Sequence, residues 1–333
     1  MKNWFARWFG GARQETRGAP QAPAATPPPV PPSDAPATGA AHADVDTVFF
    51  RWLAGAAGGD APEATERLIL DELARLADVP ARAAQLVPRV PAVIPALLRS
   101  LRDKSVSNAD FSRMVAQDMV LVAEVVREAN SPYYRPPSPV RNIEGALMLL
   151  GQNGLRMLLA RVAFRPVISM QSGRFARLVA PQVWTQSEQC ALAAATLAPH
   201  AGANPFEAYL AGLIQNVGLI VAFRLIDQVY NEDVLPRSNA FCAALLTQAR
   251  RLAHGIALEW EFPAGVAQAI VDAGRHGANA PGALAAVLST ADALAKLRLL
   301  VDAGELAPDA PLVAAVVTPR LRPCFDNLRP QDD

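Results

Sequence analysis

The chain has 333 residues, of which 51% are hydrophobic, so it can form one large domain or two small ones around a substantial core. Its 31 lysines and arginines balance 31 aspartates and glutamates, which argues against a broad basic surface, and no nucleic-acid partner is expected. Only four histidines and three cysteines are present, without a CxxC pair, so neither a zinc ribbon nor a disulfide framework is predicted. Neither a secretion signal nor an apolar run of about 20 residues is visible, and we expect a cytoplasmic protein with reduced, buried thiols.

The first 17 residues combine aromatic and basic side chains. Trp4, Phe5, Trp8 and Phe9 recur at spacings that put them on one face of a short helix. Four basic residues accompany them against a single acidic one, a composition that suits an anionic membrane surface or the groove of a partner protein. A helix this short binds weakly alone, and an unstructured tail is the alternative. Peripheral contact with the inner membrane through residues 1–17 therefore stays open beside the cytoplasmic localisation.

Residues 18–43 are dominated by proline, alanine, glycine and threonine. Because such a composition cannot bury a core and favours extended polyproline conformations, we expect a disordered, semi-rigid linker here. Further along, helical spacing of apolar residues replaces this pattern, and the alternation typical of strands is absent. Segments 45–57 and 62–77, separated by two glycines, predict a helical hairpin extension over residues 44–80.

Helix start and stop signals continue through the rest of the chain. Asn204, followed by Pro205 and Glu207, resembles a capping box that opens a helix. A helix is expected to stop at Gly151 and another before Pro166, because glycine suits a left-handed cap and proline cannot continue a helix. The helical spacing of apolar residues and the helix start and stop signals together predict an all-α protein.

Four segments together resemble the HDOD family, the bacterial signalling relatives of HD-type phosphohydrolases. In chain order they read LVPRVPAVIPALLRSL (86–101), QDMVLVAEVVREANSPYY (117–134), VRNIEGALMLLGQNGLRML (140–158) and YLAGLIQNVGLIV (209–221). The order and spacing of these segments, more than any one of them, carry the resemblance, which runs from Val87 to about Leu300.

The resemblance implies a two-lobed, all-helical bundle of the HDOD/HD-like type over residues 84–305. An N-terminal bundle at about 84–170 would pack on an HD-like bundle at about 174–305, with a C-terminal helical tail at 306–333. It also implies a regulatory role in a bacterial signalling pathway, exercised by binding a protein partner. No sensor or response-regulator domain is visible in the sequence.

The resemblance further identifies the positions of a metal site. HD-type phosphohydrolases hold a divalent metal with a histidine on one helix, a His-Asp doublet on a second and an aspartate on a third. Those positions match Gln186, the pair Gln215 and Asn216, and Asp292, so only the last ligand is kept. One carboxylate and three amides should hold a catalytic divalent metal poorly. We therefore expect a degenerate HD motif with no metal, no cofactor and no enzymatic activity.

Two interpretations of these four polar residues stay open. They could satisfy one another by hydrogen bonding inside the bundle, as buried amides usually do. They could also line a pocket for a nucleotide or second messenger. Three functions follow: a non-catalytic signalling protein that acts through protein–protein interaction, a small-molecule sensor that uses the degenerate pocket, and, least favoured, a metal-dependent phosphohydrolase.

Asn130, Tyr133 and Tyr134 mark a second candidate surface. Asn130 ends a predicted helix, and the two tyrosines follow it in a proline-rich loop. The functional interpretation is an edge on which a partner protein docks. The alternative is a capped helix whose tyrosines pack the loop onto the bundle, each hydroxyl finding a partner.

Overall fold

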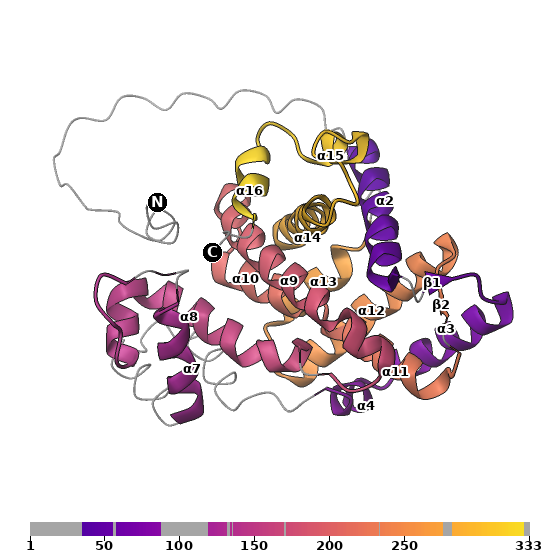
Figure 1. Cartoon of the computed structure of the whole chain (residues 1–333), viewed down its shortest axis with the longest axis horizontal. Helices are drawn as coiled ribbons and strands as arrows, with labels where there is room; N and C mark the ends of the chain where they lie inside the picture. The colour runs from indigo at the N-terminus through magenta and orange to yellow at the C-terminus, as the bar shows by residue number, and fades with distance from the viewer. Residues whose placement is uncertain are drawn as a thin grey trace.

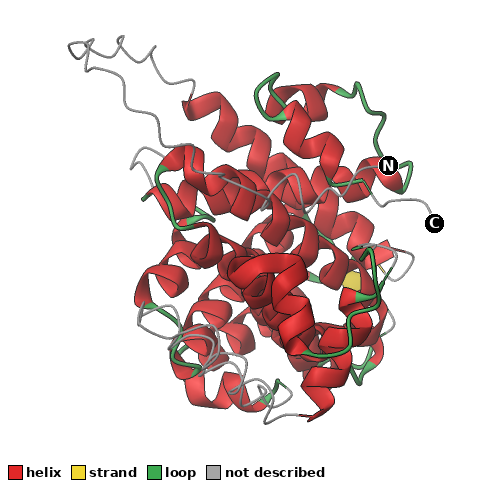
Figure 2. Cartoon of the chain, turned by 90° about the vertical axis from the view of Figure 1, so that its left-hand side faces the viewer, coloured by secondary structure: helices red, strands yellow, loops and turns green. Residues whose placement is uncertain are grey.

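The computed structural model describes residues 35–55, 58–87, 119–131, 134, 136–169, 171–232, 234–275 and 282–329. The predicted anchor residues Trp4, Phe5, Trp8 and Phe9 lie outside these ranges. Within them the chain is almost entirely helical (Figures 1 and 2), as predicted from periodicity. The strands described are two residues long, β1 (Gly58–Gly59) and β2 (Leu235–Pro236), and they pair in parallel. The all-α prediction is confirmed.

The N-terminal lobe is represented by α7 (Met119–Ala129) and α8 (Ile143–Ser169), at the lower left of Figure 1. α8 is kinked at Gly151, whose φ of 69° is left-handed, so the predicted stop appears as a sharp bend. The predicted stop before Pro166 is wrong, because α8 continues through it to Ser169. Phe164 there packs against Trp260 and Phe262, and such tertiary packing offsets the hydrogen bond that a proline removes.

In the described part of the chain, the second lobe, which we call the HD-like bundle, consists of six α-helices around the largest part of the core. Asn204 opens one of these helices as predicted, since its Oδ1 accepts hydrogen bonds from the backbone N–H groups of Phe206 (2.9 Å) and Glu207 (3.1 Å). The helices are α9 (Arg174–Leu197), α10 (Pro205–Ile214), α11 (Val217–Val229), α12 (Asn239–Glu259), α13 (Ala264–Asp272) and α14 (Ala283–Asp302), with a 3₁₀ turn η2 (Ala198–Ala201) after α9.

One segment of the HD-like bundle, residues 205–229, is long and apolar enough to span a membrane by length and composition. The sequence-based expectation of no such stretch therefore needs correction. The segment is two helices, α10 and α11, joined at Gln215 and Asn216, and 89% of its most apolar window is buried inside the fold. Packing in the core accounts for its apolar character.

The helices before the HD-like bundle differ most from expectation. α2 (Ala35–Ala54) begins inside the segment predicted to be disordered linker, and α3 (Glu63–Ala77) and α4 (Pro80–Gln85) follow. α2 packs on α12 and α14, whereas α3 packs on α11 and α12, so the predicted hairpin does not form as a separate extension. Apolar side chains seat α2; Phe50, for example, stacks on Phe223 with ring centroids 6.1 Å apart. These helices are part of the same core.

The segment after α14, predicted as a C-terminal helical tail, contains two short helices, α15 (Pro311–Val316) and α16 (Arg322–Asn327). α15 packs on α2 and α14, at the top of Figure 1, and α16 packs on α9 and α14. A buried hydrogen bond of 3.1 Å from Gln189 Nε2 to the carbonyl oxygen of Leu328 fixes the end of the tail. α2, which precedes the HD-like bundle in the chain, and α15 and α16, which follow it, thus all pack on α14.

The three cysteines, Cys190, Cys242 and Cys324, are free and buried, as predicted. Burial raises the pKa of each thiol, to about 11 for Cys242 and about 12 for Cys324, and only the thiolate reacts readily. We expect the native protein to leave all three unlabelled by Ellman's reagent at pH 8, and the protein in guanidinium chloride to titrate three thiols. Rapid labelling of a native thiol would contradict this burial.

Candidate functional site

The four polar residues matched to the HD metal positions converge in the HD-like bundle. Gln186 lies on α9, Gln215 and Asn216 lie at the junction of α10 and α11, and Asp292 lies on α14. Gln186 Nε2 is 2.5 Å and Gln215 Nε2 is 2.9 Å from Asp292 Oδ1. Asn216 Nδ2 donates to Gln186 Oε1 and, at 3.0 Å, to Ser187 Oγ. Residues from three segments of the chain thus form one hydrogen-bonded cluster, as the first interpretation predicted.

Asp292 is the centre of this cluster and fixes the orientation of the amides. A carboxylate only accepts hydrogen bonds, so the side chains of Gln186 and Gln215 must turn their NH₂ groups toward it. The second amide hydrogen of Gln215 lies near Cys190 Sγ, at 3.0 Å from Nε2. The amide nitrogens of both glutamines therefore face the carboxylate, and nitrogens of this kind have no lone pair to offer a metal.

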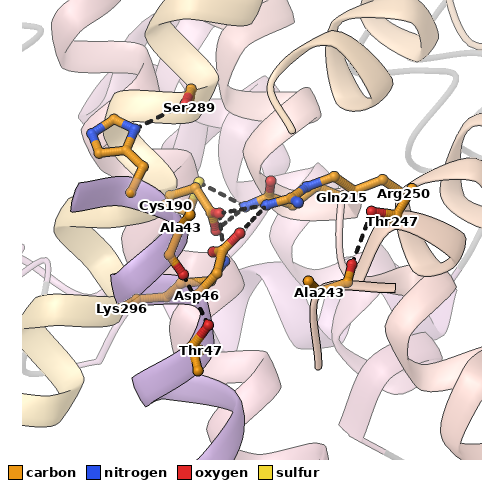
Figure 3. A network of polar contacts seen from close by, with 12 residues as sticks. Ala43, Asp46, Thr47, Cys190, Gln215, Ala243, Thr247, Arg250, Ser289 and Lys296 are labelled. Carbon is orange, nitrogen blue, oxygen red and sulfur yellow. Dashed lines mark hydrogen bonds and ion pairs between the residues drawn. The ribbon is translucent and has the colours of Figure 1, made fainter. Parts of the chain in front are cut away.

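Three charged residues that sequence analysis missed complete the site. Lys296 Nζ, one turn after Asp292 on α14, is 2.6 Å from Asp292 Oδ2 and 2.6 Å from Asp46 Oδ1. Arg250 Nη2 is 3.0 Å from Asp46 Oδ2 and 3.5 Å from Asp292 Oδ2. Figure 3 shows Asp46 reaching in from α2 and Arg250 from α12. We call the seven residues the polar network: Asp46, Gln186, Gln215, Asn216, Arg250, Asp292 and Lys296.

The charges of the polar network balance. Two cations, Lys296 and Arg250, meet two carboxylates, Asp46 and Asp292, and all four side chains are at most 15% exposed. Burial acts to lower the pKa of Lys296, but Asp292 and Asp46 raise it by more, so the pKa lies above its ordinary value of 10.5. The same balance of effects raises the pKa of Arg250. Both cations are therefore charged in the folded protein at neutral pH.

α2 closes the polar network from outside. His42, one turn before Asp46, is buried, and its Nδ1 lies 3.2 Å from Ser289 Oγ on α14. Phe49 lies beside Lys296, with Nζ 5.7 Å from the ring centroid, a favourable cation–π distance. His42 was placed in the disordered linker by its proline-rich surroundings, and the structure corrects this, since its ring is part of a helix interface.

These residues do not fit the divalent metal that the resemblance to HD-type phosphohydrolases implies. A carboxylate offers about four acceptor positions, and Asp292 already receives Gln186, Gln215, Lys296 and Arg250. The ammonium group of Lys296 lies between the two carboxylates and would repel a second cation. Among the described residues, no group of three or more histidines, cysteines, aspartates or glutamates is placed to hold a metal ion.

The three residues of the second predicted surface, Asn130, Tyr133 and Tyr134, have different outcomes in the structure. Asn130 Nδ2 donates to the carbonyl oxygens of Val126 (2.8 Å) and Val140 (2.7 Å), and its Oδ1 accepts from the Val140 N–H (2.8 Å). Tyr134 is buried, which favours the packing alternative over a docking edge, and burial raises the pKa of its phenol. Tyr133 lies outside the described residues. Asn130 therefore clamps the loop, and the packing interpretation fits Tyr134.

A buried ion cluster lies against Tyr134. Arg161, on α8, pairs with Glu128 on α7 and with Glu188 on α9. Burial raises the pKa of Glu188 by more than Arg161 lowers it. The cluster joins the N-terminal lobe to the HD-like bundle through charge-assisted hydrogen bonds, which are stronger than neutral ones.

A profile of the HDOD domain matches residues 87–274, more than half of the chain. The chain belongs to the HDOD family. The match covers α7 to α13, and with them Gln186, Gln215, Asn216 and Arg250. Asp46 on α2 and both Asp292 and Lys296 on α14 lie outside the matched range.

Solved structures share the HDOD fold. An HDOD domain protein of unknown function from Geobacter sulfurreducens is 21% identical, with a TM-score of 0.53 over 80% of this chain and 97% of its own. A protein from Marinobacter aquaeolei named as a candidate for signal transduction is 19% identical, with a TM-score of 0.54 over 83% of this chain and 65% of its own. A protein from Shewanella amazonensis named as a candidate phosphohydrolase is 19% identical, with a TM-score of 0.53 over 75% and 92%. At these identities the likeness shows the fold alone.

One curated relative, an uncharacterised protein from Treponema pallidum, is 26% identical over 138 residues. That region is 40% of this chain, and it spans only 26% of the relative. The HDOD assignment therefore depends on the profile match and on the fold.

Replacing Asn130 with alanine is expected to lower the free energy of unfolding by about 1–2 kcal/mol, because three hydrogen bonds to backbone groups are lost at a partly solvated loop. Urea denaturation monitored by circular dichroism measures the loss. Asn130→Asp keeps the acceptor for the Val140 N–H but places a carboxylate oxygen against the carbonyl oxygens of Val126 and Val140, so it should be at least as destabilised as the alanine variant. An alanine variant as stable as the parent would show that the clamp contributes nothing.

Proposed function

We propose that this chain is a non-catalytic HDOD signalling protein that acts by binding a protein partner in a bacterial pathway. The observation that carries the proposal is Lys296, whose ammonium group bridges Asp46 and Asp292 where an HD-type enzyme would need a metal. Metal-dependent phosphoryl chemistry requires a Lewis acid with an open coordination position. A site closed by the ammonium group of Lys296 would supply neither a Lewis acid nor an open coordination position.

The match to the HD metal positions supports the proposal further. Gln186, Gln215 and Asn216 would replace two imidazoles and one carboxylate with neutral amides, and Asp292 would be the ligand that is kept. A set of four ligand positions with only one anion among them would lose most of the attraction that offsets dehydration of a dication. Signalling by this protein would then depend on its surfaces, and the name of the Marinobacter relative agrees with such a role.

Metal analysis of purified protein tests the non-catalytic part. After dialysis without chelator, the wild type is expected to hold substoichiometric Mn, Fe or Mg, at the level of an Asp292→Asn variant, which controls for adventitious metal. One metal per wild-type chain that is absent from Asp292→Asn would overturn the proposal. Phosphatase assays on both preparations extend the comparison to activity.

Affinity capture tests the partner. The full-length chain, tagged at its C-terminus and expressed in its host, is expected to retain a specific protein that an unrelated tagged helical protein does not. Recovery of nothing above that control, at native expression level and after mild cross-linking, would contradict a stable partner. A matched chain without residues 1–17, compared by cell fractionation, tests peripheral membrane contact, because equal soluble fractions would reject it.

A small-molecule sensor is the second candidate. In the form predicted from sequence, the ligand would enter among Gln186, Gln215, Asn216 and Asp292, yet these side chains bind one another and α2 covers them. A ligand there would have to displace Asp46 and open the polar network. A metal-dependent phosphohydrolase is the least favoured candidate, because Asp292 is already fully hydrogen-bonded and Lys296 would repel a metal ion.

A further inference from the structure

A cavity of about 550 Å³ lies beside the polar network, bordered by the end of α3, the start of α4, α12 and α13. Its volume falls in the range of small-molecule sites, roughly 300–1,000 Å³. Among the described residues that line it, none is an aspartate or glutamate, and the polar ones are Thr247, Arg250, Arg251, His254, Gln268 and Arg275. Three guanidinium groups around one cavity favour the binding of an anion.

Two of the arginines keep donors for a ligand. Arg251 bonds Asp78 through Nη2 at 2.9 Å and donates from Nη1 to Gln248 Oε1 at 2.9 Å, and Arg275 bonds Asp272 through Nη1 at 3.1 Å. The side chains of Asp78 and Arg275 are 67% and 71% exposed, and such exposed ion pairs are weak. A guanidinium group has five N–H donors in a planar fork, so both arginines could bind an anion without losing these partners.

Arg250 joins the cavity to the polar network. Its Nη2 faces Asp46 and Asp292, while its stem passes Gly274 at the cavity wall. A Cβ atom on residue 274 would lie 2.5 Å from Arg250 Cδ and 2.9 Å from Nε and Nη1, so the glycine makes room for the guanidinium group. Arg250 is thereby held at the cavity by buried carboxylates on its far side.

The remaining lining adds neutral polar and apolar groups. His254 Nδ1 lies 3.0 Å from the carbonyl oxygen of Ala267, so that nitrogen carries the proton and Nε2 is left for another partner. Ala77, Pro80, Leu258 and Val271 supply an apolar wall. A cavity lined by both cationic and apolar side chains suits an organic molecule with a phosphate group.

We propose that this cavity binds a small phosphate-bearing molecule, with Arg251 and Arg275 contacting the phosphate oxygens and Arg250 supporting them from the cavity wall. Arginine is suited to phosphate because its planar fork matches two oxygens at once. The site is separate from the degenerate HD positions and needs no metal. The proposal goes beyond the partner-binding function, since it concerns a small-molecule ligand and not a protein partner.

Isothermal titration of the full-length chain, in buffer with EDTA, tests the proposal with four probes: inorganic phosphate, pyrophosphate, AMP and ATP. A nucleotide that binds more tightly than pyrophosphate indicates an organic phosphate, whereas equal affinities indicate that the phosphate groups alone are recognised. Both results support the site. The absence of binding heat and of any rise in melting temperature for all four probes, up to about 5 mM, would overturn it.

Matched variants then locate the site. Arg251→Gln and Arg275→Gln are each expected to weaken binding of the tightest probe about tenfold, the effect of one charge-assisted hydrogen bond. Arg127→Gln is the control, because Arg127 is similarly exposed and pairs with Glu124 on α7, outside the cavity. Since both cavity arginines are exposed at least 43%, the variants should keep the parental melting temperature without ligand. Equal affinity in the cavity variants and the control would overturn the location.

Discussion

Replacing Gly218 with alanine is expected to lower the free energy of unfolding by about 3 kcal/mol or more, at or above the upper end of the usual range for overpacking. Gly218 lies near the start of α11, where the helix crosses α12. A Cβ atom there would lie 1.9 Å from the carbonyl oxygen of Ala249 and 2.5 Å from the backbone nitrogen of Ala253. Both atoms belong to the backbone of α12, so no side chain can move aside, and the helices must separate.

Gly265→Ala is the matched control for this prediction. Gly265 also lies near the start of a helix, α13, but a Cβ atom there meets nothing within 4 Å. That variant should gain roughly 0.4–1 kcal/mol, because alanine loses less backbone freedom on folding. Urea titrations of both variants and the parent measure the difference. Equal denaturation midpoints for Gly218→Ala and the parent would contradict the close approach of α11 to α12.

Local signals in the sequence predicted much of the fold. Asn204 with Pro205 opens α10, and Gly151 bends α8, because capping and left-handed conformations depend on a few adjacent residues. The start of α2 escaped prediction. Its Pro36 occupies the first turn, where the missing N–H costs no hydrogen bond, so proline there does not prevent a helix. The average composition of residues 18–43 predicted a linker and did not distinguish a proline in the first turn of a helix from prolines in an extended segment.

The candidate site was predicted only in part. The resemblance brought together Gln186, Gln215, Asn216 and Asp292, which the structure confirms as neighbours. The Lys296 contact had a sequence signal, since a lysine four residues after an aspartate on a helix lies within reach of it. Asp46 had none, because its distance of 250 residues from Lys296 gives no local pattern.

The polar network depends for its charge balance on α2, a helix outside the HD-like bundle. Without α2, the bundle would hold two cations, Lys296 and Arg250, against the single carboxylate of Asp292. Asp46 restores neutrality and is delivered by a helix that lies outside the HDOD match. The charge balance of the polar network and the docking of α2 are therefore one electrostatic arrangement, in which Lys296 is neutralised by Asp292 and by an aspartate from a remote helix.

Lys296→Met is expected to lower the free energy of unfolding by about 3–5 kcal/mol, the usual cost of removing one partner from a buried ion pair. The substitution keeps the length of the side chain and leaves Asp46 and Asp292 facing each other with only Arg250 between them. Chemical denaturation at neutral pH measures the loss. Arg67→Ala, which removes an exposed pair with Glu63, should change the same quantity by less than about 0.5 kcal/mol.

A double-mutant cycle separates the network from simple loss of packing. Asp46→Asn alone leaves an excess cation, whereas Asp46→Asn with Lys296→Met leaves Arg250 and Asp292 as a neutral pair. The double variant should therefore be more stable than the sum of the single losses predicts, by about 0.5–3 kcal/mol. Strict additivity would show that the Asp46–Lys296 contact, at 2.6 Å, contributes no coupling, and α2 would then be held by its apolar face alone.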